Sequence, residues 1–513
     1  MYGSLKLKSL IFTLIVLLAT ACGQQKEEEY AKVIPSDASN LISIDVGSLI
    51  EKAGLNGADG DKIKSEIIEN ISGNLSESTI KLLSEIVDNT SVSGVDLLLP
   101  IYSYLTIDGD TSDEFYLTIV AKMGDEVKFN SMINQLAEEE ILAPVIVGDV
   151  CSYSLSADKE DIIAFNEHAI ILVSTLDSVD KLGMVTDMFN LGDEQNIYAN
   201  SDFQRMIAYD GDVKFMGGLD DLPEDITLQI RAQLVGSQVD VTKYRVAGAI
   251  AFDDGEFSLV CENYSNDPEY QAYIDKVASK TEPMKGDIVS SLPASSLAVI
   301  ASYFDGEFAV EEFKINQLLS AKNARDTIFV KLIEDFVSSF KGDVVVSPVS
   351  FNSMTDFSVR ILADVKSGSG EALEALLNHQ QIKPLIKSDG DDSYYISTPF
   401  ITVYIGIKDD VFYVLNNRSD IDNIGKKVSN SIVTQYPNVK GVVNYSVVNV
   451  SEVLRVLELF DLMSVVPGEM IGVCREISFV ESTVTKDSKF TFKIVLSDKN
   501  VNPLKLVTEV IFN

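Results

Sequence analysis

The sequence of 513 residues contains no tryptophan and only two histidines. Tryptophan is the most common ring for stacking on sugars, so its absence argues against a glycoside hydrolase, although tyrosine can take its place. His168 falls in a predicted hairpin turn, and His379 follows a helix-like stretch whose C-terminus favours a cation. Histidines in such positions argue against a catalytic triad, and we expect an exposed turn residue and a capping residue.

Cysteine is also scarce, and neither a CxxC nor an HExxH motif occurs. Catalytic zinc needs His, Cys or carboxylate ligands at such spacings, so the sequence argues against it. Besides Cys22, only Cys151, Cys261 and Cys474 remain, an odd number without close pairs, which is not a disulfide framework. Each lies beside strand-like residues and is expected to be a buried free thiol. One disulfide with one thiol left over stays an alternative.

Acidic residues are abundant, and two glycine-containing loops gather them. Asp108–Glu114 (DGDTSDE) and Asp389–Asp392 (DGDD) present oxygen ligands of the kind that calcium prefers. Neither loop has the glycine and distant bidentate acid of an EF-hand, so we expect solvated hairpin tips, with a weak calcium site as the alternative. The segment KSGSGE at Lys366 lacks the buried strand that precedes a nucleophile elbow, and it predicts a flexible loop.

The charge balance is strongly acidic, with 78 Asp and Glu against 41 Lys and Arg and a formal net charge of -37. Such a field repels phosphate backbones, which excludes nucleic acid as a partner. The 46% hydrophobic content is enough for sizeable cores. Together with the chain length it predicts two or three domains.

An apolar run, LIFTLIVLLATAC at positions 10–22, follows two lysines near the N-terminus. Its apolar core is well short of the roughly twenty residues that a membrane-spanning helix needs. Small residues lead into Cys22, in a pattern that resembles a bacterial lipobox with Ala19 where leucine is usual. We therefore expect a signal peptide over residues 1–21 and lipid attachment, with palmitate among the acyl chains, at Cys22. Two or three acyl chains would make the anchor permanent.

Residues 22–32 are polar and show no apolar periodicity, so they predict a flexible acidic tether. Within this segment, Lys26 with Glu27 and Glu28 resembles the export signal of Bacteroidota lipoproteins, which consists of a lysine and acidic residues. That signal directs lipoproteins to the outer leaflet of the outer membrane. We expect an outer-membrane location, with surface display favoured over the periplasmic face.

Two distant segments of the chain share one order of apolar residues. Residues 162–183 (IIAFNEHAIILVSTLDSVDKLG) align with residues 404–425 (YIGIKDDVFYVLNNRSDIDNIG). The same shift aligns FYLTIVA at Phe115 with FSVRILA at Phe357, and weaker matches near both ends fall in the same order. Chance similarity would not keep its register over such a distance, so we interpret the pattern as an internal duplication.

The duplicated segments predict the fold class. Each reads as a β-hairpin followed by a helix that ends at Gly183 or Gly425. Alternating strands joined by hairpins indicate an α+β fold, with a largely antiparallel sheet and helices packed on one face. We expect two homologous tandem modules, at residues 33–280 and 290–513. An amphipathic helix is predicted at Ser451–Leu462.

A proline after an apolar pair, then Ala38 and Ser39, an apolar strand and the segment LIEKAGL at Leu49–Leu55 follow the predicted acylated cysteine. This arrangement resembles the Bacteroidota lipoproteins that hold domain of unknown function 4836. The resemblance covers nearly the whole mature chain. It implies an envelope lipoprotein and supplies no catalytic residues, so it bears on location and not on activity.

These observations lead us to expect a membrane-anchored envelope lipoprotein that is a non-enzymatic binding or scaffolding protein. The alternatives are a hydrolase with an unrecognised carboxylate or metal site and a purely structural envelope spacer. No catalytic, cofactor or metal residue is assigned. The expected partners are the membrane, through the N-terminal acyl chains, and a protein or polymer ligand where the two modules meet. A tightly packed pair of modules without a groove is the other arrangement.

Overall fold

The computed structural model describes residues 28–55, 60–62, 64–65, 80–81, 84–86, 90–107, 115–174, 179–218, 221, 243–313, 327–353, 355–390, 393–399, 401–465 and 468–511. The chain divides into two compact units. Unit 1 comprises Met1–Gln271 and Lys499–Asn513, and unit 2 comprises Ala272–Asp498. The end of the chain thus belongs to the first unit, whereas the sequence places it in the second module.

Unit 1 combines strands with short helices. The helical elements whose bounds lie within the described residues are η1 (Glu29–Val33), α2 (Val46–Lys52), η2 (Thr90–Val92), α5 (Glu126–Glu138), α6 (Lys181–Phe189), η3 (Ile197–Ala199), α7 (Ser201–Ile207) and α17 (Pro503–Ile511). Its strands are β1 (Ser39–Ile44), β2 (Val95–Asp96), β3 (Ile101–Ile107), β4 (Phe115–Met123), β5 (Ile146–Val147), β6 (Ser152–Leu155), β7 (Asp161–Phe165), β8 (Ala169–Ser174), β9 (Val213–Gly218), β10 (Arg245–Asp253) and β11 (Glu256–Tyr264).

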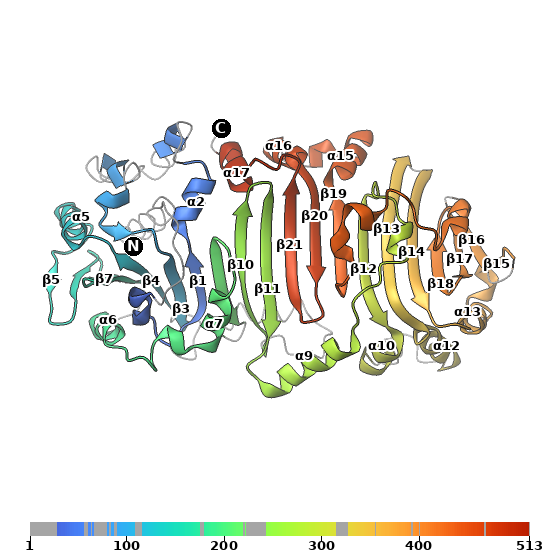
Figure 1. The fold of residues 1–513 in the computed structure, drawn as a ribbon, viewed down its shortest axis with the longest axis horizontal. Helices are drawn as coiled ribbons and strands as arrows, with labels where there is room; N and C mark the ends of the chain where they lie inside the picture. Colours follow the sequence, from blue (N-terminus) through green and yellow to red (C-terminus); the bar gives the residue numbers. More distant parts are fainter. Residues whose placement is uncertain are drawn as a thin grey trace. The chain divides into compact units, whose positions relative to one another are not determined.

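The strands of unit 1 form an open antiparallel sheet in the order β5-β6-β7-β8-β4-β3-β1-β9-β10-β11 (Figure 1). The short strand β2 also pairs with β4. In β1, Leu41 lies between Tyr104 of β3 and Met216 of β9. Strands that follow one another, such as β7 and β8 or β10 and β11, pair as hairpins. The antiparallel sheet and the α+β class agree with the sequence prediction.

Helical elements cover both faces of the unit 1 sheet. One face packs against α2 and α5 through Ile50 and Ile133. The other packs against η1, α6 and α7 through Tyr30, Val185 and Phe203. The prediction of helices on one face is therefore wrong for this unit. Its physical reason lies in β7 and β8, which are buried at every residue, because a strand that is apolar throughout needs cover on both sides.

Unit 2 has the same kinds of elements, and α9 (Pro268–Lys280) begins in unit 1 and ends in unit 2. Its helical elements are η6 (Val289–Ser291), α10 (Gly306–Phe313), α12 (Thr327–Val337), α13 (Gly370–Leu377), η7 (Lys383–Leu385), η8 (Arg418–Asn423), α14 (Ile432–Gln435), η9 (Pro437–Val439), α15 (Val450–Leu459), η10 (Met463–Val465) and α16 (Gly468–Glu476). Its strands are β12 (Ala298–Asp305), β13 (Phe340–Ser353), β14 (Asp356–Val365), β15 (Lys387–Ser388), β16 (Ser393–Ser397), β17 (Thr402–Lys408), β18 (Val411–Leu415), β19 (Asn444–Asn449), β20 (Ile477–Val484) and β21 (Lys489–Leu496).

The strands of unit 2 are ordered β15-β16-β17-β18-β14-β13-β12-β19-β20-β21, and every pair is antiparallel. Strand by strand, this is the order found in unit 1, with β12 in the place of β1 and β21 in the place of β11. One face packs against η6, α14 and η9 through Val289, Ile432 and Val439. The opposite face packs against α12 and α13 through Phe336 and Leu373. Helical elements therefore cover both faces here as well.

The helix predicted at Ser451–Leu462 is present as α15, and Asn449 caps it by accepting a hydrogen bond from the Glu452 N–H at 3.2 Å. The helix expected to end at Gly183 instead begins nearby. The Asp180 side chain caps α6 and accepts from the Gly183 N–H at 2.9 Å, so this aspartate marks a helix start that the sequence prediction missed.

In the second copy the predicted helix is a 3-10 helix, η8, which ends shortly before Gly425. Gly425 has a φ of 72°, a left-handed conformation that glycine adopts without strain.

The described residues include the last part of the segment predicted to be the tether. In η1, Tyr30 is 2% exposed and Ala31 is 0% exposed. The Glu28 N–H donates to the Tyr198 hydroxyl at 2.7 Å, and the Tyr102 hydroxyl donates to the Glu28 carboxylate at 3.1 Å. The last residues of the predicted tether therefore form a 3-10 helix whose apolar side chains dock into the core. The part before Glu28 lies outside the described residues.

Candidate functional site

Within the described residues, unit 2 contains a solvent-open pocket of about 380 Å³. Its lining residues come from the segment around η9 and from the strands β20 and β21; they are Pro437, Asn438, Lys440, Val442, Glu481, Thr483, Thr491 and Lys493. Ligand pockets usually measure about 300–1,000 Å³. This pocket therefore suits one small molecule or the end of a polymer.

Paired residues of the strands β20 and β21 form the floor of the pocket. Glu481 of β20 lies opposite Lys493 of β21, and Thr483 lies opposite Thr491. Because directly opposite residues of antiparallel strands share a face, these four side chains form one polar patch. Thr483 also pairs with Tyr445 of β19, which belongs to the hydrophobic core of the unit. The patch thus lies on the core side of the sheet, at the margin of that core.

Residues 436–442 form the wall of the pocket, and this short segment is anchored at both ends. At its start, the Tyr436 ring packs edge-on against Phe479, with ring centroids 4.9 Å apart. In its middle, Val439 is completely buried. At its end, the Met284 N–H donates to the Val442 carbonyl at 2.8 Å. The polar side chains between these anchors are therefore held in place beside the sheet.

Glu481 is the buried acceptor of the pocket, with 5% exposure. Its carboxylate accepts a hydrogen bond from Asn438 Nδ2 at 3.1 Å. Burial raises the pKa of the Tyr436 and Tyr445 phenols, and the neighbouring Glu481 charge raises both further. Both phenols therefore stay protonated at neutral pH. The Lys440 side chain is exposed and makes no polar contact with any residue in the described part of the chain.

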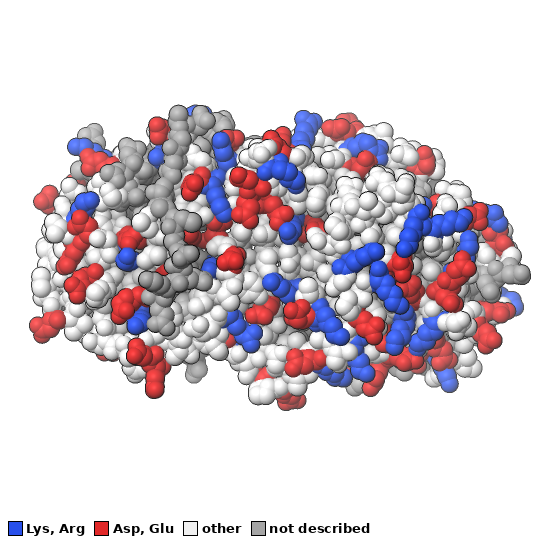
Figure 2. All heavy atoms as spheres, in the orientation of Figure 1, with Lys and Arg blue, Asp and Glu red and all other residues white. Residues whose placement is uncertain are grey.

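Charge is distributed unequally between the two units. Unit 2 holds 22 of the 41 Lys and Arg residues but only 30 of the 78 Asp and Glu residues. Unit 1 holds the remaining 19 basic and 48 acidic residues. Figure 2 shows basic side chains gathered over the part of unit 2 that contains β13, β14, β17 and β18. The pocket, with two lysines and one carboxylate, thus lies in the unit that is closer to neutral.

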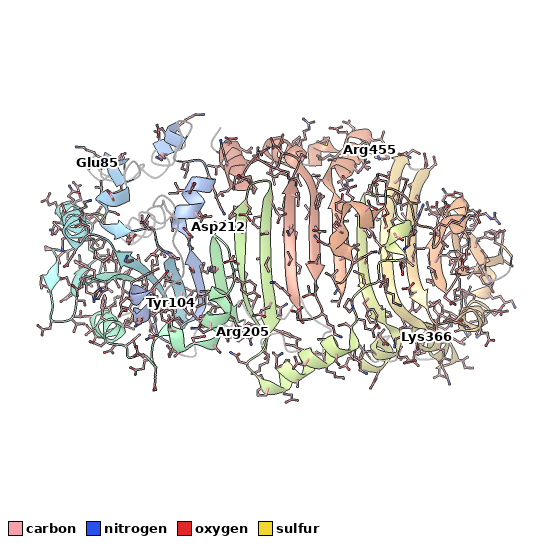
Figure 3. All side chains as sticks on the ribbon, viewed as in Figure 1. Glu85, Tyr104, Arg205, Asp212, Lys366 and Arg455 are labelled. Atoms are coloured by element: carbon pink, nitrogen blue, oxygen red, sulfur yellow. The ribbon has the colours of Figure 1, made fainter. Side chains whose placement is uncertain are left out.

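A second polar cluster, in unit 1, connects α2 with β9 and β10. Lys52 Nζ lies 2.8 and 2.9 Å from the two carboxylate oxygens of Asp212 and 3.4 Å from Asp253 Oδ1. Asp212, labelled in Figure 3, is 4% exposed and also accepts from the Phe252 N–H at 2.7 Å and from the Ser48 hydroxyl. These bonds join elements distant in sequence, so we assign the cluster a structural role. Lys52, in the segment LIEKAGL, thus joins α2 to the buried carboxylate of Asp212.

A third cluster lies on β10 and β11, the strands that correspond in order to β20 and β21. Arg245 Nε lies 2.7 Å from Asp202 Oδ2, and Arg245 Nη2 lies 2.7 Å from Asp221 Oδ2. The Arg205 guanidinium lies over the Tyr264 ring, 4.5 Å from its centroid. Charged groups here bind one another, whereas the Lys440 side chain of the unit 2 pocket is exposed and has no polar partner among the described residues.

The two histidines do not take part in the pocket. His168 is exposed in the turn between β7 and β8, as predicted. His379 follows α13 and stacks on the Phe329 ring, with ring centroids 4.8 Å apart. The residues that the structure describes contain no group of three His, Cys, Asp or Glu side chains placed to hold a metal ion.

Several predicted sites fall partly or wholly outside the described residues. Cys22 and the loop Asp108–Glu114 are among these. In the loop Asp389–Asp392, Asp389 pairs with Arg418 at 2.8 Å, and the last two residues are not described. Among the helices that are described, none has the length and apolar character needed to cross a membrane.

The three remaining cysteines are free thiols. Cys151 and Cys261 are buried, and burial raises the pKa of both thiols. Cys474 is half-buried and lies in α16, so the prediction that it lies beside strand residues is wrong. The segment around Cys474 contains two glycines, yet its neighbours continue as a helix up to β20.

Sequence reasoning missed the pocket. Glu481 and Lys493 stand in alternating strands, where charged residues ordinarily face solvent. Glu481 is instead buried because a separate segment, residues 436–442, covers it. One local signal exists, since Glu481 has the same strand parity as the apolar Phe479 and therefore points to the core side.

Residues 30–504 match the family described as Domain of unknown function (DUF4836). This match covers most of the sequence, so the chain belongs to that family, as the resemblance suggested. No curated protein and no solved structure matches the chain.

Proposed function

We propose that this DUF4836 protein is a lipid-anchored, non-enzymatic binding protein of the bacterial cell envelope. The observation that carries the binding role is the unit 2 pocket. A buried carboxylate, two lysines and two threonines converge there on a space open to solvent. Convergent polar groups of this kind orient a ligand by hydrogen bonds and charge.

The anchor is proposed from the N-terminal sequence, with Cys22 as the acylated residue and residues 1–21 as the signal peptide. Glu28, the first residue that the structure describes, is bound by Tyr102 and Tyr198. The intervening residues, if extended, would span roughly 20 Å. The tether thus holds the protein close to the membrane, and we propose the surface-exposed side of the outer membrane.

We also propose that the two units are homologous modules derived by duplication. Support comes from the aligned segments of the sequence and from the identical strand order of the two sheets. Neighbouring strands could pair in many other orders, so the agreement extends the sequence argument to the whole sheet.

Lipid attachment is tested by growing cells with radiolabelled palmitate and fractionating the membranes. We expect label in the native protein and none in a Cys22→Ser variant, which should leave the membrane fraction. Label that is absent from the native protein, or unchanged fractionation of the variant, would refute the anchor. Protease treatment of intact cells then tests display, because a body that resists digestion does not face outward.

Binding is tested by cross-linking intact envelopes and purifying the acylated protein with its ligands. We expect the same ligand in replicate preparations, and its loss in a Glu481→Gln variant that folds normally. Failure to recover any reproducible ligand would support the purely structural spacer instead. If the protein converts the recovered ligand into a product, and if Glu481→Gln abolishes this conversion, the result would support the alternative function as a hydrolase.

A further inference from the structure

We infer that the unit 2 pocket binds a small anionic ligand rich in hydroxyl groups, of the class of sugar acids and sugar phosphates. This inference rests on the proposed binding function and names its ligand chemistry. The site is wholly within unit 2 and is formed by the segment 436–442 and the strands β20 and β21.

The charge of the pocket selects an anion. Two lysines, Lys440 and Lys493, line it together with one carboxylate, that of Glu481. Asn438 Nδ2 already donates to Glu481, so the carboxylate is partly satisfied inside the wall. The exposed Lys440 ammonium has no described partner. A carboxylate or phosphate on the ligand would complete this site with a charge-assisted hydrogen bond.

The remaining lining groups select hydroxyls. Thr483 and Thr491 face each other across the strands, and each hydroxyl can donate and accept. Glu481 is an acceptor for a hydroxyl donor, and the Asn438 side-chain oxygen can accept another. A polyol presents donors and acceptors on successive carbons, which matches this alternation. An apolar anion such as a fatty acid would offer no hydrogen bond to the two threonine hydroxyls.

The same lining disfavours neutral sugars. No aromatic ring lines the pocket, and its apolar surface comes from Pro437 and Val442. A neutral pyranose would therefore lack a ring to stack on, and most of its binding energy would have to come from hydrogen bonds that compete with water. An ionic contact with Lys440 supplies the missing attraction.

Unit 1 provides an internal comparison. On the corresponding strands, Arg245 is already held by Asp202 and Asp221. Its basic group is thus neutralised within the fold, while Lys440 of unit 2 is exposed. Arg245 begins β10, whereas Lys440 lies in the segment 436–442, so the comparison concerns the ion pairing of the two groups and not their position in the sheet.

The inference is tested by isothermal titration of the full-length, detergent-solubilised protein with four probes. These are D-glucuronate, D-glucose 6-phosphate, D-glucose and inorganic phosphate. We expect saturable binding of glucuronate, glucose 6-phosphate or both, at least about tenfold tighter than that of glucose or phosphate alone. A preference between the two anionic sugars distinguishes a carboxylate from a phosphate ligand.

Variants then locate the site. Lys440→Ala should weaken binding by about ten- to a hundredfold, the range for a lost charge-assisted hydrogen bond. Lys426→Ala removes another exposed lysine of the same unit and serves as the matched control, with unchanged affinity. Glu481→Gln should weaken binding without changing the salt dependence that Lys440 contributes. Thermal unfolding of each variant confirms that it folds.

The inference is overturned if neither anionic sugar binds, if glucose binds as tightly as they do, or if Lys440→Ala and Lys426→Ala bind alike. Phosphate binding as tight as that of glucose 6-phosphate would overturn the hydroxyl requirement. A ligand recovered from cross-linked envelopes together with failure of all four probes would overturn this inference and leave the proposed binding function intact. If cross-linking recovers no reproducible ligand and none of the four probes binds, both this inference and the proposed binding function are overturned.

Discussion

Replacing Asp212 by alanine should destabilise unit 1 more than any single surface change. Asp212 is 4% exposed and accepts hydrogen bonds from Lys52 Nζ, the Phe252 N–H and the Ser48 hydroxyl. Removing one partner of a buried ion pair costs about 3–5 kcal/mol. The Lys52 side chain is 26% exposed and keeps Asp253 at 3.4 Å, so we expect the lower end of the range, about 3 kcal/mol.

A local measurement is needed, because a chain with two units need not unfold in one step. Hydrogen exchange followed by mass spectrometry reports opening of individual segments. We expect Asp212→Ala to lower the protection of the β9 and β10 amides by roughly a hundredfold, which corresponds to about 3 kcal/mol. Guanidinium unfolding followed by circular dichroism should show the same loss in the transition that includes unit 1.

Two variants serve as controls. Asp253 is 67% exposed, so Asp253→Ala should cost at most about 0.5 kcal/mol. Lys52→Met removes the cation but leaves Asp212 its bonds from Ser48 and Phe252, so its cost should lie between the other two. If Asp212→Ala and Asp253→Ala have the same effect, the structural role assigned to the cluster is refuted.

Three further predictions concern other buried groups. Burial raises the pKa of Asp364, so between its ordinary value and the raised value the unfolded chain loses the proton first and stability falls as pH rises. Asp364→Asn should therefore gain stability relative to the native protein as the pH rises above about 4 in urea unfolding, and a constant difference would contradict this. A thiol reagent should modify Cys474 before the buried Cys151 and Cys261, so loss of the fast phase is expected in Cys474→Ser. Phe203→Ala empties a completely buried site and should cost about 3–5 kcal/mol in guanidinium unfolding, whereas a cost below about 1 kcal/mol would contradict the packing.

The parts of the fold that were predictable depend on neighbouring residues. Alternation of apolar residues and short polar turns indicated the hairpins, because both signals lie within a few residues of each other. The turn between β17 and β18 is an example, since Asp409 and Asp410 both adopt positive φ. Helix boundaries were less predictable, as Asp180 shows by starting α6 where a helix end was expected.

The features that could not be predicted depend on residues far apart. Lys52 and Asp212 are separated by 160 residues, and nothing in either segment indicates the other. The cover on both sheet faces likewise depends on which helices return to the sheet. Glu481 looks like a solvent-facing strand residue until the segment 436–442 is seen to lie over it.

The two units show why an identical strand order does not imply an identical role. A shared architecture keeps the cores and hairpins under similar constraints, while side chains at the sheet margin are free to diverge. In unit 1, Arg245 at the start of β10 is bound by Asp202 and Asp221, which stabilises the fold. In unit 2, Glu481 and Lys440 line an open space. The Arg245 cluster of unit 1 is therefore assigned to the stability of the fold, and the search for a ligand belongs in the pocket of unit 2.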